Sequence, residues 1–213
     1  MKGEKTVAKR KPLDIILATH NPSKVAQIKP LLDGLPIKLL TMNEAGLVGE
    51  AKEDGQNLGQ NALRKAIFAW EQSRKYCIAD DTGLFIDALG GRPGIHAARW
   101  AGEKATTEEI MQFTLQKLRG IPIADRTATF KTMALIISPE KVVHKFIGSV
   151  HGKILMQPRC ALQPKMPYSA IFLPDGQSKV WAEMTVAEEN KISHRAQAFL
   201  KLRAYLEELL KQQ

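Results

Sequence analysis

Two adjacent carboxylates, Asp80 and Asp81, are the residues of this sequence whose type and placement most directly indicate chemistry. They follow residues 76–79, a short apolar run between charged neighbours that is typical of a buried strand. In α/β sheets, ligands collect at the carboxyl ends of strands, and two neighbouring carboxylates there require compensating positive charge. A divalent cation carrying a phosphate ligand supplies it, because Mg²⁺ binds one or two carboxylates together with phosphate oxygens. The alternative is a solvated Asp-Asp-Thr-Gly turn.

A second candidate site follows the first expected strand. Asn21 and Pro22 suit the N-cap and the first position of a helix with one apolar face. The free amide groups at such a helix start bind anions, and Lys24 in the first turn directs a cation to the same place. The segment is not a Walker P-loop, since the Gly-rich run and the Gly-Lys-Ser/Thr are missing. An ordinary capped helix is the alternative.

A helix expected over 57–74 brings a third polar group to the same region. Its apolar residues recur at helical spacing. Asn57, Asn61 and Lys65 share another face because they lie four residues apart. If that face meets the end of the 76–79 strand, Lys65 offsets the carboxylates or a bound phosphate. The alternative is a solvated lysine, the usual state of a lysine on a helix.

The elements that must position these groups alternate between helices and strands. Thr106 and Glu109 form a capping box that opens one further helix. The other expected elements are helices over 106–118 and 193–210 and strands over 13–18, 126–138, 142–154 and 168–173, the middle two as a long hairpin. This order predicts an α/β fold with a mixed, elongated central β-sheet flanked by helices, in two lobes with a cleft between them.

Composition narrows the class of protein. With 213 residues, 44% of them hydrophobic, the chain can bury a full core, which we expect as one domain at 13–213. Residues 1–12 are basic, lack the apolar centre of a signal peptide and predict a disordered tail. No apolar stretch approaches the ~20 residues that span a bilayer. Cys77 and Cys160 form neither a disulfide framework nor a metal-finger spacing. We therefore expect a cytoplasmic protein without a membrane partner.

A formal net charge of +9 and a sequence pI near 9.6 indicate an anionic partner. The positive residues are spread along the chain, aromatic residues make up only 6%, and no ribonucleoprotein signature is visible. A small polyphosphate is therefore favoured over a nucleic acid. The alternative is a basic protein that binds RNA or acidic partners through its tail and surface.

Five sequence blocks stand in one order along the chain. They are Ala-Thr-His-Asn-Pro-Ser-Lys at 18–24, Glu-Asp-Gly at 53–55 with Asn-Ala-Leu-Arg-Lys-Ala at 61–66, Asp-Asp-Thr-Gly-Leu at 80–84, Ala-Leu-Gly-Gly-Arg-Pro-Gly at 88–94, and Ala-Glu-Met at 182–184 with Ile-Ser-His-Arg at 192–195. In these blocks the chain resembles the inosine triphosphate pyrophosphatase family, from about residue 13 to residue 202. One block alone would be a weak signal, whereas five in order are a strong one.

The resemblance implies a Mg²⁺-dependent, homodimeric hydrolase that cleaves triphosphates such as ITP, dITP and XTP to the monophosphate and pyrophosphate. At the matching positions it implies catalytic roles for Asp81, Asp80 and Lys65, with Asp81 or Asp80 orienting the attacking water. Glu53 and Asp81 would bind Mg²⁺. The substrate-binding residues that it implies are Thr19, Asn21, Lys24, Tyr168, Ser193, His194 and Arg195. These roles fit phosphoryl transfer, which needs positioning and charge neutralisation.

The chain departs from the family where the base would bind. The family's Gly-Phe-Gly-Tyr/Trp-Asp-Pro segment is replaced by residues 165–170. In it, Tyr168 is the aromatic residue that remains to contact the ring of the base, and Ser169 stands where the family has aspartate. Glu189 stands where the family has a lysine, and Gly59-Gln60 where it has Glu-Glu. We therefore expect an altered or relaxed base preference as one outcome. The usual activity of the family and a non-catalytic nucleotide-binding protein are the other two.

Overall fold

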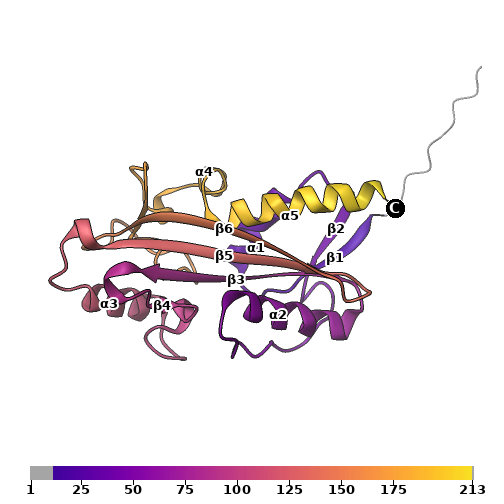
Figure 1. The fold of residues 1–213 in the computed structure, drawn as a ribbon, viewed down its shortest axis with the longest axis horizontal. Coiled ribbons are helices and arrows are strands. Elements are labelled where there is room, and N and C mark those ends of the chain that lie inside the picture. The colour runs from indigo at the N-terminus through magenta and orange to yellow at the C-terminus, as the bar shows by residue number, and fades with distance from the viewer. Residues whose placement is uncertain (1–11, 213) are drawn as a thin grey trace, which may run out of the picture.

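The computed structural model describes residues 12–212. The disordered tail expected at residues 1–12 lies outside the described residues, apart from Pro12. A long, mixed β-sheet runs through the molecule, with helices against both of its faces (Figure 1). This arrangement confirms the fold class predicted from the order of the elements.

The sheet has seven strands, in the order β2-β1-β3-β5-β6-β7, with β4 paired to β3. Strands β1, β2 and β3 are parallel, whereas β3, β5, β6 and β7 pair antiparallel. The strands are β1 (Leu13–Leu17), β2 (Ile37–Thr41), β3 (Tyr76–Ile86), β4 (Pro93–Gly94), β5 (Thr127–Ile137), β6 (Val143–Ile154) and β7 (Phe172–Pro174). The long β5–β6 hairpin confirms the predicted pair of strands.

The described chain has five α-helices: α1 (Pro22–Leu31), α2 (Leu58–Ser73), α3 (Thr107–Lys117), α4 (Val186–Glu189) and α5 (His194–Lys211). Of these, α1, α2 and α5 carry residues of the expected site. Short 3₁₀ helices occur at Asp87–Leu89, Ala97–Arg99, Ile123–Asp125 and Trp181–Glu183. The predicted capping box at Thr106 with Glu109 is formed, and a second one, at Thr185 with Glu188, opens α4. No described helix is long and apolar enough to cross a membrane.

The two faces of the sheet bury different helices because successive strand side chains point to opposite faces. Ile15 and Ile78 pack in one apolar cluster with residues of α1 and α5, whereas Ile16 and Cys77 pack in another with residues of α2. In Figure 1, α5 lies above the sheet and α2 below it. Consecutive residues of β3 therefore face different helices.

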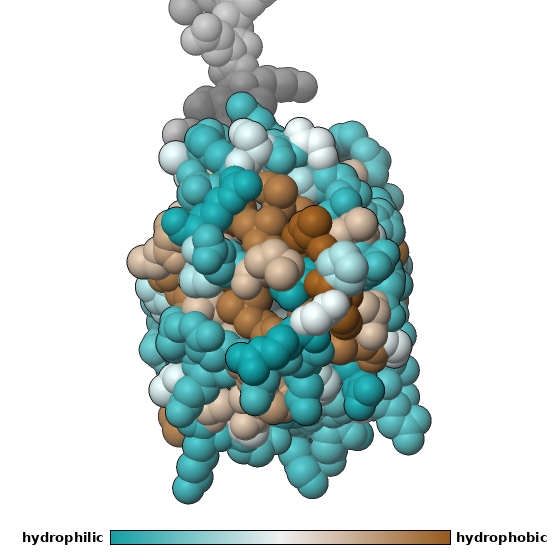
Figure 2. Space-filling view, turned by 90° about the vertical axis from the view of Figure 1, so that its left-hand side faces the viewer, coloured by the Kyte–Doolittle hydropathy of each residue, from teal (hydrophilic) through white to brown (hydrophobic). Residues whose placement is uncertain are grey.

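A third apolar cluster fills the end of the molecule that carries α3, at the left of Figure 1. It includes Leu84, Phe130, Tyr168 and Met111. Figure 2 looks onto this end and shows apolar side chains gathered in the middle of the face, surrounded by polar ones. The described chain thus has separate apolar packing on each side of the middle of β3.

The middle of β3 has an open edge. Strand β1 pairs with β3 only as far as Leu17 opposite Ile78, and β4 joins the same strand at Leu84 opposite Gly94. Between these pairings, no strand of the described chain is registered against residues 79–83 on that edge. The opening therefore brings side chains from both faces of the sheet close to one place on the edge of β3.

Two expectations about the strands were wrong. Strand β3 does not end at residue 79: pairing with β5 continues to Ile86 opposite Ala128, so Asp80 and Asp81 lie inside the strand and not in a solvated turn. The partner strand overrides the turn-like composition of this segment. The strand expected at 168–173 is confined to Phe172–Pro174, and β2 was not predicted.

Candidate active site

Asp81 faces α2 across the open edge of β3. Its Oδ1 accepts a hydrogen bond from Lys65 Nζ at 2.7 Å, and its Oδ2 accepts one from Asn61 Nδ2 at 3.2 Å. Asn61 and Lys65 reach the same carboxylate because they lie four residues apart on one face of α2. The predicted meeting of this helix face with the carboxylate is present.

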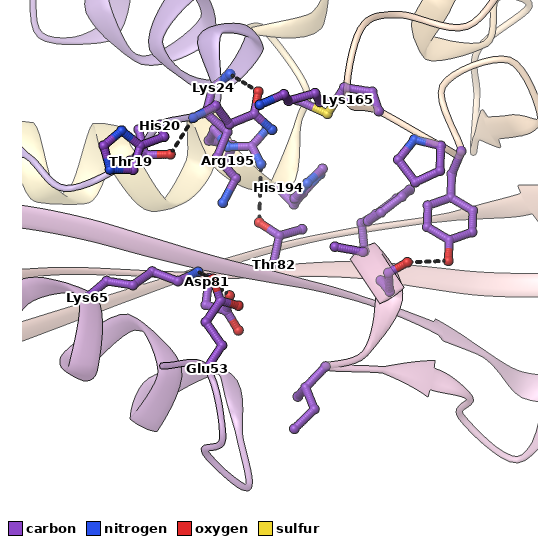
Figure 3. A pocket seen from close by; sticks show the side chains of 18 of the residues that line it. Thr19, His20, Lys24, Glu53, Lys65, Asp81, Thr82, Lys165, His194 and Arg195 are labelled. Carbon is purple, nitrogen blue, oxygen red and sulfur yellow. Dashed lines mark hydrogen bonds and ion pairs between the residues drawn. The ribbon is translucent and has the colours of Figure 1, made fainter. Parts of the chain in front are cut away.

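Glu53 joins the same cation from the loop before α2. Lys65 Nζ lies 3.0 Å from Glu53 Oε1, so one ammonium group holds two carboxylates (Figure 3). Burial alone would lower the pKa of Lys65, but the charges of Asp81 and Glu53 outweigh it and raise the pKa. Burial raises the pKa of Asp81 despite the charge of Lys65. These three residues form a compact charged group on the α2 side.

Asp80 faces the opposite side of the sheet and pairs with different cations. Its Oδ2 lies 3.0 Å from Lys24 Nζ and 3.4 Å from Arg195 Nε, and the residue is only 1% exposed. Burial alone would raise its pKa, but the charges of Lys24 and Arg195 hold the pKa well below its usual range. Asp80 is not among the residues that line the cavity described below. It is placed to hold Lys24 and Arg195 and not to contact a ligand.

The start of α1 differs from the expected open anion site. Asn21 caps the helix as predicted, with its side chain accepting from the backbone N–H groups of Ser23 and Lys24. Those amides are therefore already hydrogen-bonded. Thr19 Oγ1 accepts from Asn21 N–H at 3.2 Å and orders the turn. The cationic group that this turn presents to the cavity is the side chain of Lys24.

The start of α5 brings two buried residues to the cavity. Arg195 donates to Gln27 Oε1 and, at 3.2 Å, to Thr82 Oγ1. The His194 ring stacks on Phe130 with centroids 4.8 Å apart, and burial lowers its pKa well below the usual value, so the imidazole is neutral. Ser193 caps α5 by accepting from Ala196 N–H and does not line the cavity.

These groups surround a cavity of about 330 Å³ at the open edge of β3. Its lining includes the charged residues Lys24, Lys65, Glu53, Asp81, Glu189 and Arg195, together with Thr19 and Asn21. It also includes the aromatic and apolar side chains of Phe130, Met166, Tyr168 and Trp181, which belong to the apolar cluster at the α3 end or lie in the loop before β7. Figure 3 shows Lys65, Asp81 and Glu53 on one side of β3, and Lys24 with Arg195 on the other. The cavity therefore suits a ligand with an anionic part and a flat apolar part.

The loop at 163–169 closes the apolar part of the cavity. Ser23 Oγ donates to Pro164 O at 2.7 Å, which ties this loop to the start of α1. Tyr168 Oη donates to Ala97 O at 2.8 Å, and burial raises the pKa of its phenol. Ser169 Oγ donates to Met166 O and accepts from Gln163 N–H, so its hydroxyl orders the loop.

Three residues at this site were not predicted from the sequence. Gln27 bridges Arg195 and Glu189, Thr82 accepts from Arg195, and Lys165 lines the cavity from a backbone with φ of 56°. Gln27 and Thr82 are uncharged, and both depend on a partner more than 100 residues away in the chain, so nothing in the sequence indicated their role. For Lys165, the one sequence signal is that a lysine replaces the glycine that the family has at this position.

The model of the Ham1 family matches residues 15–205. The chain belongs to the Ham1 family. This confirms the resemblance drawn from the five sequence blocks.

Curated relatives and solved structures of Ham1 proteins cover most of the chain. A protein of Thermoanaerobacter sp. (strain X514), named dITP/XTP pyrophosphatase, is 41% identical over 194 residues, which are 91% of this chain and 96% of the relative. One of Bacillus subtilis (strain 168) with the same name is 38% identical over 194 residues, which are 91% of this chain and 97% of that protein. The structure of a HAM1 protein from Coxiella burnetii is similar with a TM-score of 0.82 and 34% identity, covering 92% of this chain and 99% of that one.

Proposed function

We propose that this chain is a nucleoside triphosphate pyrophosphatase that hydrolyses the bond between the α and β phosphates, releasing a monophosphate and pyrophosphate. The observation that carries this proposal is a single cavity lined both by the charged residues Lys24, Lys65, Asp81 and Glu53 and by aromatic side chains. Membership of the Ham1 family supports the same activity, and several relatives carry the name dITP/XTP pyrophosphatase.

Glu53 and Asp81 fit the binding of Mg²⁺ in such a reaction. Mg²⁺ takes one or two protein carboxylates and completes its shell with water and substrate phosphates. The described residues contain no cluster of three or more His, Cys, Asp or Glu side chains suited to a metal. Two carboxylates joined by Lys65 match a site that is complete only with the substrate. When bound, the metal would neutralise phosphate charge and make its water more acidic.

The protein's own residues then have separate roles. Lys24 and Lys65 balance the charge of the phosphates, and the Asp81 carboxylate accepts a hydrogen bond from the attacking water and orients it. Asp80 keeps Lys24 and Arg195 in place from the far side of the strand. The base lies against Tyr168 and the ring of His194, in the apolar part of the cavity.

The test is pyrophosphate release from ITP, dITP, XTP and the standard triphosphates, with and without Mg²⁺. We expect Mg²⁺-dependent release, and we expect Asp81→Asn to lower it at least 100-fold, because that variant removes the carboxylate that orients water. Asp175→Asn, on an exposed loop outside the cavity, is the matched control and keeps full activity. Unchanged turnover by Asp81→Asn would contradict this mechanism. Nucleotide binding without release of pyrophosphate would identify a non-catalytic binding protein.

We also propose that the enzyme acts as a homodimer in the cytoplasm. The family resemblance supports the dimer, and the free thiols of Cys77 and Cys160 suit a reducing compartment. Sedimentation equilibrium tests the assembly: twice the mass of the 23.7 kDa chain is expected. A monomer at micromolar concentration would contradict it.

A further inference from the structure

Glu189 is a buried carboxylate in the wall of the cavity that the proposed reaction does not use. It ends α4, is only 3% exposed and lines the cavity. Its Oε1 accepts a hydrogen bond from Gln27 Nε2 at 2.7 Å. Carboxylates are rarely buried without full pairing, so the position of this one requires an explanation.

The second oxygen of Glu189 has no hydrogen-bond partner among the described residues. Two other residues of the cavity wall also carry a buried polar atom without a partner in the described chain, His194 at Nδ1 and Trp181 at Nε1. Buried polar groups are almost always hydrogen-bonded, and an exception needs a specific reason. For atoms in a cavity wall, such a reason is a ligand whose edge carries hydrogen-bond donors and acceptors of its own.

The network behind Glu189 fixes its Oε1 as an acceptor. Arg195 donates to Gln27 Oε1, so the amide nitrogen of Gln27 must face Glu189 and donate to it. Ser169 does not compete for this role, because its hydroxyl is already bonded to Met166 O and Gln163 N–H. Glu53 and Asp81 also line the cavity but pair with Lys65, whereas Glu189 has one oxygen without a partner in the described chain.

We propose that Glu189 reads the base and favours nucleotides whose base carries an exocyclic amino group. The inference rests on the proposed function, since it assigns the base to the aromatic part of the same cavity. A carboxylate accepts hydrogen bonds, so an amino group satisfies Oε2, whereas a carbonyl oxygen at the same ring position would set two acceptors against each other. The flat aromatic wall can contact any base, so the discrimination between bases comes from the hydrogen bond to Glu189.

Matched nucleotide pairs test this choice. ATP and ITP differ at one ring position, amino against carbonyl, and CTP and UTP differ in the same way. We expect kcat/KM for pyrophosphate release to be at least about tenfold higher for the amino member of each pair. Equal values or a preference for the carbonyl members would overturn the inference while leaving the proposed function in place.

Three variants separate the charge of Glu189 from its packing. Glu189→Gln keeps the shape and offers both a donor and an acceptor, so the amino-to-carbonyl ratio should fall towards one. Glu189→Lys should reverse the ratio, because an ammonium group donates to a carbonyl. Glu188→Gln is the matched control: this neighbour is outside the cavity wall, pairs with Lys179, and should leave the ratio unchanged. A ratio that Glu189→Gln does not alter would overturn the assignment.

Binding measurements keep the inference testable if no nucleotide is hydrolysed. In that case the proposed function fails, and calorimetric titration with ATP and with ITP replaces the kinetic ratio. Tighter binding of ATP by the wild type, lost in Glu189→Gln, would support the reading of the base by Glu189. Equal affinity for the two nucleotides would overturn it.

Discussion

Asp80 and Asp81 are neighbours in the chain, but the structure gives them opposite surroundings. Side chains alternate along β3, so Asp80 meets Lys24 and Arg195 while Asp81 meets Lys65. The sequence predicted that this pair needed positive charge, and it placed Lys65 correctly. It could not separate the two residues, because that required knowing that the strand continues through them. The contact between Lys65 and the acidic pair was thus predictable, whereas the separate partners of Asp80 and Asp81 were not.

Asp80→Asn should lower stability more than a surface carboxylate does. Removing the charge leaves Lys24 and Arg195 buried without their partner, so we expect a loss of about 3–5 kcal/mol in the free energy of unfolding at pH 7. Urea denaturation measures it. Glu207→Gln, which breaks an exposed pair with Arg203, is the control and should lose less than about 1 kcal/mol.

The contribution of Asp80 also depends on pH, in a direction set by its lowered pKa. The folded state holds the ionised form, so the unfolded state takes up its proton first as the pH falls. The stabilisation is complete above about pH 4, near the unfolded pKa, and is lost progressively below it. The stability gap between wild type and Asp80→Asn should therefore stay constant down to about pH 4 and narrow as the pH falls further. A gap that widens on acidification would contradict this assignment.

At the scale of elements, the contact between α5 and β6 decides where Arg195 lies. Gly148 of β6 sits directly under the first turn of α5: a Cβ there would lie 2.1 Å from His194 O and 2.7 Å from Ala198 N. These are backbone atoms, so the helix itself would have to move. The close approach of helix and sheet therefore requires a residue without a side chain at this position.

Gly148→Ala should displace the start of α5 and with it His194 and Arg195. We expect a clear loss of thermal stability and at least a tenfold loss of kcat/KM, because small misplacements of positioning groups reduce rates strongly. Differential scanning fluorimetry and pyrophosphate release measure the two effects. Ser149→Ala, the next residue of β6, is the control and should change neither by much. Wild-type activity in Gly148→Ala would show that α5 can shift without consequence.

Helices and long strands were predictable because their signals are local. Caps such as Asn21 and Thr106 fall where expected, since the side chain and the amides that it satisfies are three residues apart or fewer. Strand β2 and the end of β3 were missed because their partners lie far along the chain, as Leu13 opposite Ile37 and Ile86 opposite Ala128. Loop 163–169 was beyond prediction for the same reason, since Ser23 and Ala97 hold it.

On the scale of the whole molecule, metal and nucleotide should stabilise the fold together. In the free protein Lys65 already pairs with both Glu53 and Asp81 and offsets one of their two negative charges, so Mg²⁺ alone has to compete with the ammonium group there. A nucleotide with a non-hydrolysable α–β bond brings phosphate oxygens to complete the metal site. We expect Mg²⁺ alone to raise Tm by less than about 1 °C, and both ligands at saturation to raise it by about 5 °C.

Thermal melts of the full chain with each ligand and with both check this coupling. Asp81→Asn should lose the part of the shift that depends on Mg²⁺, because it removes one of the two carboxylates. A shift with Mg²⁺ alone as large as with both ligands would contradict the view that the site is completed by substrate.

The interrupted pairing of β3 also bears on self-association. A bare strand edge is normally a template to which another extended chain can add. Here the bare stretch is bounded by β1 at Ile78 and by β4 at Leu84, and within it Lys65 Nζ already bonds the Asp80 carbonyl at 3.3 Å. An incoming strand would have to displace a charged side chain and fit a gap closed at both ends. The fold can therefore leave backbone open at its centre for a small ligand without inviting fibril-like growth of the sheet.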